Sequence, residues 1–215
     1  MKMTVDISPE KFLAPTKLIE SDHPAIIKKA EEITSDALLA EDKARNIFYF
    51  IRDQISYEFK ISFDEKAYFA SEILKAGGGF CTQKTILFCA LARNCGIPAG
   101  LYFYDIVDYT LPQYIIDIIK TRTLYHHGIT ALYLNNRWIQ YDATLDKQRT
   151  LRKQRYPVEF STDHDCLMRT KTSTGDRHIE TIHDYGLYSD VTIDEIVLWF
   201  KEGYPHLVEI LSNME

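Results

Sequence analysis

Residues 77–100, GGGFCTQKTILFCALARNCGIPAG, decide the fold that this sequence predicts. Three glycines and a phenylalanine lead into an apolar run that starts at Cys81 and stops before Gly96, a residue typical of a helix C-terminus. The run therefore predicts a helix from Cys81 to Cys95. Helical spacing places Cys81 on the same apolar stripe as Phe88, so we expect the thiol at the helix tip, turned toward the protein.

The segments on either side of this helix indicate an α+β fold. Helical spacing predicts helices over residues 24–35, opened by Ser21 or Asp22, over residues 36–57, and over residues 70–76. Aromatic and β-branched residues then predict strands over residues 99–107, 129–135 and 137–144, with Asn135 and Asn136 as the last turn. Between the first two strands we expect an inserted helix at about residues 109–125. Beyond residue 150, polar turns precede a C-terminal helix over residues 192–211.

The position of Cys81 suits a nucleophile. At a helix N-terminus, unpaired backbone N–H groups and the helix dipole favour the thiolate and can hold an oxyanion beside the sulfur. The glycines before it either end the preceding helix or leave the backbone open to a substrate, which makes Gly78, Gly79 and Phe80 candidates for substrate access. The other cysteines, at positions 89, 95 and 166, are expected to be inert fillers of the interior.

A base and an orienting carboxylate follow in HHGITALYLNNRWIQYDAT, residues 126–144. A two-residue turn pairs Ile129 with Asp142, which makes His127 the diagonal neighbour of Asp142 on one face of the sheet. His126 then points to the opposite face. Cysteine, histidine and aspartate are the three parts of a thiol catalytic triad, so we expect Cys81, His127 and Asp142 to form one.

Composition limits the other classes of function. The 215 residues, 46% hydrophobic and 26% charged, predict a single domain over residues 1–215. The net charge of −6 argues against a nucleic-acid partner, and no run of about 18 apolar residues indicates a membrane span. We therefore expect a cytoplasmic protein. The cysteines form no paired CxxC motif and no Asp-rich calcium loop is present, so the sequence predicts neither a metal nor another cofactor.

The two motifs together resemble the transglutaminase-like superfamily, over about residues 43–144. Residues 77–100 are similar to its nucleophile helix, with a leucine-alanine-arginine end followed by glycine-isoleucine-proline. Residues 126–144 are similar to its histidine and aspartate strands, although Gly128 and Ile129 replace the usual alanine and tryptophan after the histidine. The inserted segment at 109–125 and the C-terminal extension, residues 150–215, lie outside the likeness.

The resemblance implies a papain-like core with N-terminal helices, in which a nucleophile at a helix N-terminus packs against an antiparallel sheet. It implies Cys81 as nucleophile, His127 as general base and Asp142 as the residue that orients the imidazole. The implied reaction is acyl transfer on an amide of a peptide or protein, including a glutamine side chain. Water as acceptor gives a protease or amidase, whereas an amine gives a transglutaminase. Tyr57, on the segment before the nucleophile, is the candidate for a second oxyanion donor.

Three alternatives stay open at this point. An arylamine N-acetyltransferase has the same order of triad residues, and an inactive binding module could share the fold. A metal site could use His126, His127 and Asp142, but adjacent residues on a strand point apart. The polar stretch at 161–185, with His164, His178 and His183, is expected to be a solvated loop or a lid.

Overall fold

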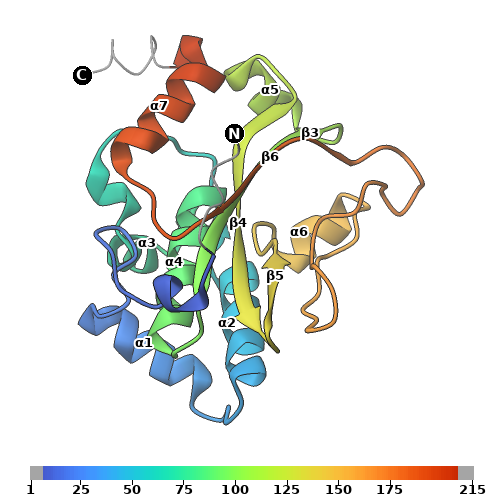
Figure 1. Cartoon of the computed structure of the whole chain (residues 1–215). Helices are drawn as coiled ribbons and strands as arrows, with labels where there is room; N and C mark the ends of the chain where they lie inside the picture. Colours follow the sequence, from blue (N-terminus) through green and yellow to red (C-terminus); the bar gives the residue numbers. More distant parts are fainter. Residues whose placement is uncertain (1–6, 208–215) are drawn as a thin grey trace.

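A four-stranded antiparallel sheet with helices packed on it forms the centre of the computed structural model, which describes residues 7–207 (Figure 1). The strands are β3 (Ala99–Asp108), β4 (Thr123–Leu134), β5 (Arg137–Tyr141) and β6 (Ile179–Tyr188), in the order β5-β4-β3-β6. A separate parallel pair joins β1 (Ser56–Tyr57) to β2 (Gly78–Gly79). The mixed helix-and-sheet architecture confirms the predicted fold class. That residues 1–215 form a single domain remains a prediction.

The helices occupy three parts of the chain. The N-terminal part contains α1 (Pro24–Thr34), α2 (Ala40–Gln54), α3 (Ala70–Ala76) and α4 (Cys81–Asn94), with 3₁₀ turns at Pro9–Phe12 and Glu65–Tyr68. After β3 comes α5 (Gln113–Ile119), after β5 comes α6 (Lys147–Arg152), and α7 (Ile193–Gly203) follows β6. Within residues 7–207, no helix is both long and apolar enough to cross a bilayer.

Helix α4 is the central element of the core. It packs against α1, α2 and α3 on one side and against β3 and β4 on the other (Figure 1). Every residue from Thr82 to Arg93 is buried, so the helix has no solvent-facing side. The predicted single apolar stripe was therefore wrong: Cys81 faces the protein because the whole helix is enclosed.

The register of β4 and β5 confirms the predicted turn. Thr130 pairs with Tyr141 and Leu134 with Arg137, so two residues remain to connect the strands. Those residues, Asn135 and Asn136, have φ values of 52° and 60°, the left-handed conformation that a type I′ turn requires at both central positions.

Several boundaries differ from the predicted ones. The N-cap of α1 is His23, whose Nδ1 accepts from the N–H of Ala25, and not Ser21 or Asp22. Helix α2 begins later than predicted, at Ala40. The inserted helix is shorter than residues 109–125, because residues 109–112 connect β3 to it without helical structure and residues 123–125 belong to β4. The predicted C-terminal helix ends as α7 at Gly203, and its residues after 207 lie outside the described part of the chain.

Strand β6 was predicted as part of a polar loop or lid. It instead pairs with β3 at the edge of the sheet, and two register shifts interrupt the pairing. Its residues from Glu180 to Asp184 are exposed, so apolar alternation, the usual sequence signal of a strand, is missing there. His178, just before the strand, is buried, and only His164 and His183 are solvated as expected.

A buried lysine fastens α4 to the segments around it. Lys84 is 1% exposed, and its Nζ donates to the carbonyl oxygens of Ile55 at 2.7 Å and Thr144 at 2.8 Å. Burial lowers the pKa of Lys84 to about 7, although the charge of Asp142 opposes the shift. A neutral amine still donates both hydrogen bonds, so the contact does not require the charge.

We predict that this lysine makes stability depend on pH. Between about pH 7 and the ordinary value of 10.5, the folded protein releases the Lys84 proton while the unfolded chain keeps it. The free energy of unfolding of the wild type should therefore rise with pH relative to Lys84→Met, by at most about 1.4 kcal/mol per pH unit. Urea unfolding at a series of pH values measures this difference. Lys75→Met, at an exposed lysine, is the control, and parallel curves for wild type and Lys84→Met would contradict the prediction.

Candidate active site

The N-terminus of α4 lies against β4 with no room for a side chain between them. A Cβ added to Gly128 would come within 3.2 Å of the Thr82 Cα and 3.4 Å of the Thr82 nitrogen. Half-buried Cys81, the first residue of α4, therefore lies beside the histidine strand, and the Gly128 N–H hydrogen-bonds to its sulfur. The replacement of alanine by glycine after the histidine has this steric reason.

His127 and Asp142 lie together, as the strand register predicts. The Nε2 atom of His127 is 2.9 Å from Oδ2 of Asp142, and each side chain is 4% exposed. The N–H of Thr144 donates to Oδ1 of the same carboxylate at 3.1 Å. Nε2 is thus hydrogen-bonded to Asp142. The Nδ1 atom of His127 is buried and makes no hydrogen bond of ordinary geometry to any described residue.

The pKa values of the three groups shift in the directions that favour charge. Burial by itself raises the pKa of Cys81, but His127, the Gly128 N–H and the Thr82 hydroxyl together lower it. Burial by itself lowers the pKa of His127, but Asp142 and Cys81 raise it to about 10. His127 likewise keeps the pKa of Asp142 low despite burial. The Cys81 thiolate and the His127 imidazolium therefore stabilise each other.

His126 lines the cavity that contains Cys81, and two aromatic rings hold its imidazole. Its ring stacks between Tyr185, at a centroid distance of 4.0 Å, and Trp199, at 4.4 Å. Burial lowers the pKa of His126 to about 4, so the ring is neutral. In residues 7–207, no three His, Cys, Asp or Glu side chains are placed to share a metal ion.

The residues predicted to admit the substrate do not form an open backbone. Gly78 and Gly79 are both buried in β2, and a Cβ on Gly78 would lie 2.8 Å from Glu58 Oε1. Close packing accounts for these glycines, while Gly77, with φ of 67°, ends α3. Phe80 is also buried, but it lines the cavity that contains Cys81.

Tyr57 stands where two cavities meet. One cavity, of about 30 Å³, contains Cys81, and the other, of about 290 Å³, contains His127. Tyr57 and Leu124 line both. Within residues 7–207 the Tyr57 hydroxyl has no hydrogen-bond partner, and burial raises its pKa well above the ordinary value, so it stays protonated. It can therefore donate, and it remains the candidate for a second oxyanion donor.

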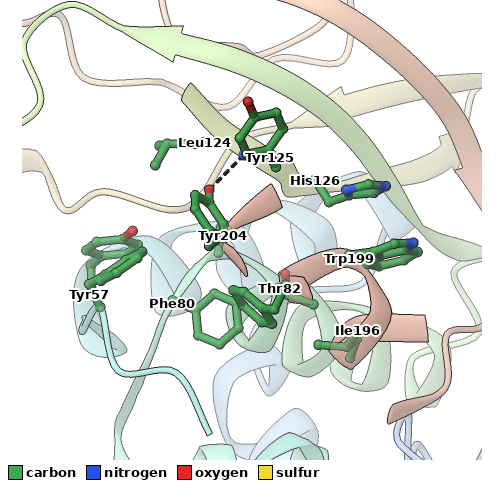
Figure 2. A pocket seen from close by; sticks show the side chains of 12 residues that line it. Tyr57, Phe80, Thr82, Leu124, Tyr125, His126, Ile196, Trp199 and Tyr204 are labelled. Atoms are coloured by element: carbon green, nitrogen blue, oxygen red, sulfur yellow. Dashed lines mark hydrogen bonds between the residues drawn. The ribbon is translucent and has the colours of Figure 1, made fainter. Parts of the chain in front are cut away.

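Helix α7 covers the smaller cavity. Figure 2 shows Trp199 and Ile196 of α7 and the following Tyr204 facing Phe80 and Thr82 across it. The Tyr204 hydroxyl accepts from the Tyr125 N–H at 2.8 Å, which fastens the end of the helix to β4. Side chains fill most of the space over Cys81, and sequence reasoning assigned this helix no role at the site.

The remaining cysteines lack activation. Burial raises the pKa of Cys89 to about 12 and that of Cys166 to about 11, and burial also raises the pKa of half-buried Cys95. These directions fit their predicted role as interior fillers.

Comparison with known proteins identifies the family to which this chain belongs. A match to the transglutaminase-like superfamily covers residues 27–143, more than half of the chain. The chain belongs to this superfamily. The match starts before residue 43, where the sequence motifs first indicated it, and ends one residue after Asp142, which directly follows β5.

Solved structures with the transglutaminase-like fold resemble this superfamily member in part. A proposed cysteine protease from Cytophaga hutchinsonii is 21% identical, with a TM-score of 0.51, and the match covers 66% of this chain and 43% of that one. A TGase is 15% identical, with a TM-score of 0.37, and the match covers 66% of this chain and 35% of that one. This chain thus spans less than half of each structure. No curated protein matches the sequence.

We predict that Cys81 is the first cysteine to be alkylated. With limiting iodoacetamide near pH 6, its rate should exceed those of the other cysteines by roughly tenfold or more, because it alone has a lowered pKa. His127→Ala should remove most of this advantage, whereas His164→Ala, at an exposed histidine, should not. Peptide mapping with mass spectrometry gives the rates. A Cys81 rate that climbs only near pH 8.5, as for an ordinary thiol, would show that the site is not activated.

We also predict that α7 limits the size of reagents that reach Cys81. Phe200 lines the small cavity and packs on Phe80 with ring centroids 5.7 Å apart. Phe200→Ala should therefore accelerate the reaction of Cys81 with a bulky maleimide more than that with iodoacetamide. Leu198→Ala, on the same helix and 50% exposed, is the matched control. An unchanged ratio of the two rates in Phe200→Ala would contradict the prediction.

Proposed function

We propose that the protein is a thiol acyl-transfer enzyme that acts on amide bonds of peptides or proteins through Cys81, His127 and Asp142. The contact that supports this most directly is the 2.9 Å pair between Nε2 of His127 and Asp142, beside a cysteine at a helix N-terminus. An inactive binding module would need neither a carboxylate buried against an imidazole nor a lowered thiol pKa.

The first half of the reaction forms a thioester. The Cys81 thiolate attacks the carbonyl carbon, and the carbonyl electron pair moves to oxygen, next to the free N–H groups at the start of α4. The tetrahedral adduct then collapses and the C–N bond breaks. The leaving nitrogen takes a proton from Nδ1 of His127, because Asp142 holds the Nε2 proton. Tyr57 is the side chain we assign to the second oxyanion hydrogen bond.

The second half returns the enzyme to its starting state. Neutral His127 takes a proton from water or from an amine, which attacks the thioester carbon and releases the thiolate. Water gives hydrolysis and an amine gives transamidation.

The test is a mass-spectrometric screen of peptide libraries and lysates for products made by wild type and absent with Cys81→Ala. Shortened peptides identify a hydrolase, and new cross-links identify a transglutaminase. We predict that Asp142→Asn lowers kcat by roughly 10² to 10⁴ with KM little changed, because the amide favours the wrong imidazole tautomer. Equal losses of stability and activity in Asp142→Asn would instead indicate a structural role for Asp142. Products that persist in Cys81→Ala would contradict the proposed function.

A further inference from the structure

The cavity beside His127 is lined by both apolar side chains and cations. Its volume of about 290 Å³ is at the lower end of ligand pockets, which run from about 300 to 1,000 Å³, so it suits one residue of a substrate. Leu111 and Ile115, from the α5 segment, and Met168 are apolar residues of its lining. The lining also includes the cations Arg149, Lys153 and Arg155, from α6 and the residues after it.

The carboxylate that lines this cavity is already satisfied. Oδ1 of Asp108 accepts from the N–H of Thr110 at 2.8 Å and from its hydroxyl at 2.6 Å, while Oδ2 lies 3.5 Å from Arg155. Arg155 is 3% exposed and donates to the Thr110 carbonyl, yet its Nε has no partner among the described residues. Asp108 therefore compensates one of the three cations.

The other two cations are less well compensated. Arg149 donates to the Tyr57 carbonyl at 2.9 Å, and its nearest carboxylate oxygen, on Asp146, is 3.8 Å away. The ammonium group of Lys153 has no ion pair within residues 7–207. Burial and the charges of Arg155 and Arg149 lower the pKa of this exposed lysine, and the charge of Asp108 only partly opposes the shift.

The geometry points to a binding site for a carboxylate on a short aliphatic stem, carried by the peptide substrate. The stem would lie against Leu111, Ile115 and Met168, and the carboxylate would pair with Lys153 and Arg149. Two sources share this chemistry, an acidic side chain and a free C-terminus. That the carrier is a peptide rests on the proposed function, whereas binding of the carboxylate does not require catalysis.

The triad restricts where the carboxylate can bind. The pKa shifts favour the anions of Cys81 and Asp142 and the cation of His127, so the triad offers a second carboxylate no unpaired cation. An anionic substrate group is therefore held at the Lys153 end of the cavity. This separation keeps the charged group away from the amide that reacts.

Methyl NMR of the full chain tests this site directly. Met168 lines the cavity, so the ¹³C-methyl signal that disappears in Met168→Leu reports occupancy. Cys81→Ala, which cannot turn over, is titrated with three compounds that share one backbone. N-acetylglutamine methylamide is neutral, N-acetylglutamate methylamide adds a side-chain carboxylate, and N-acetylglutamine adds a C-terminal carboxylate. We expect one of the two acids to shift the Met168 signal with a Kd about five- to tenfold below that of the neutral amide.

Matched variants show whether the cavity cations cause the difference. Lys153→Gln should remove most of the preference for the acid, and added salt should weaken it. Arg152→Gln, an exposed cation on the same helix that does not line the cavity, should leave the preference intact. Equal Kd values for acids and amide, or a preference that survives Lys153→Gln and Arg149→Gln together, would overturn the inference.

The outcomes separate this site from the proposed function. A reactive Cys81 with no preference for the acids would remove the anion site and leave the triad. A preference for an acid in a protein whose Cys81 is unreactive would keep the anion site on an inactive scaffold.

Discussion

The contact between the N-terminus of α4 and β4 at Gly128 is the constraint on which the site depends. Because a Cβ at position 128 would press on the Thr82 backbone, glycine lets the strand approach closely enough to bring its N–H to the Cys81 sulfur. The helix cannot shift to relieve a larger residue, since every residue from Thr82 to Arg93 is buried. The position of the thiol relative to His127 is thus a property of the whole core, and not of a local loop.

Two buried basic side chains near this contact, His127 and Lys84, have pKa values shifted in opposite directions. His127 gains charge because Asp142 and Cys81 surround it, whereas Lys84, one turn along α4 from Cys81, donates to two carbonyl oxygens and tends toward neutrality near pH 7. A permanently charged lysine would compete with His127 for the field of Asp142. A group that need not be charged thus holds the segments around Ile55 and Thr144, and the Asp142 carboxylate keeps its hydrogen bond to His127.

Local signals in the sequence predicted the pairing of β4 with β5, but they did not predict edge strand β6 or the position of α7. The Asn135-Asn136 turn has only one compatible register, so the pairing of His127 with Asp142 followed from residue parity. Strand β6 was not predicted, because residues 180–184 are exposed and because the strand pairs with β3, which is distant in the sequence. The sequence did not predict that α7 covers Cys81, for a similar reason. The spacing of Trp199 and Phe200 predicts a packed helix, but it does not reveal the surface against which the helix packs.

The parts of the site have different origins along the chain. The triad lies within the superfamily match at residues 27–143, but the two cavities beside it depend on α5, α6 and α7. Helix α7 fills the Cys81 side with aromatic rings, while α5 and α6 leave the His127 side open and lined by cations. Cys81 lines the smaller cavity, so a molecule that enters on that side meets Phe200 and Trp199 of α7. The surroundings of Cys81 and His127 are in this way set by three helices that carry neither of these residues nor Asp142.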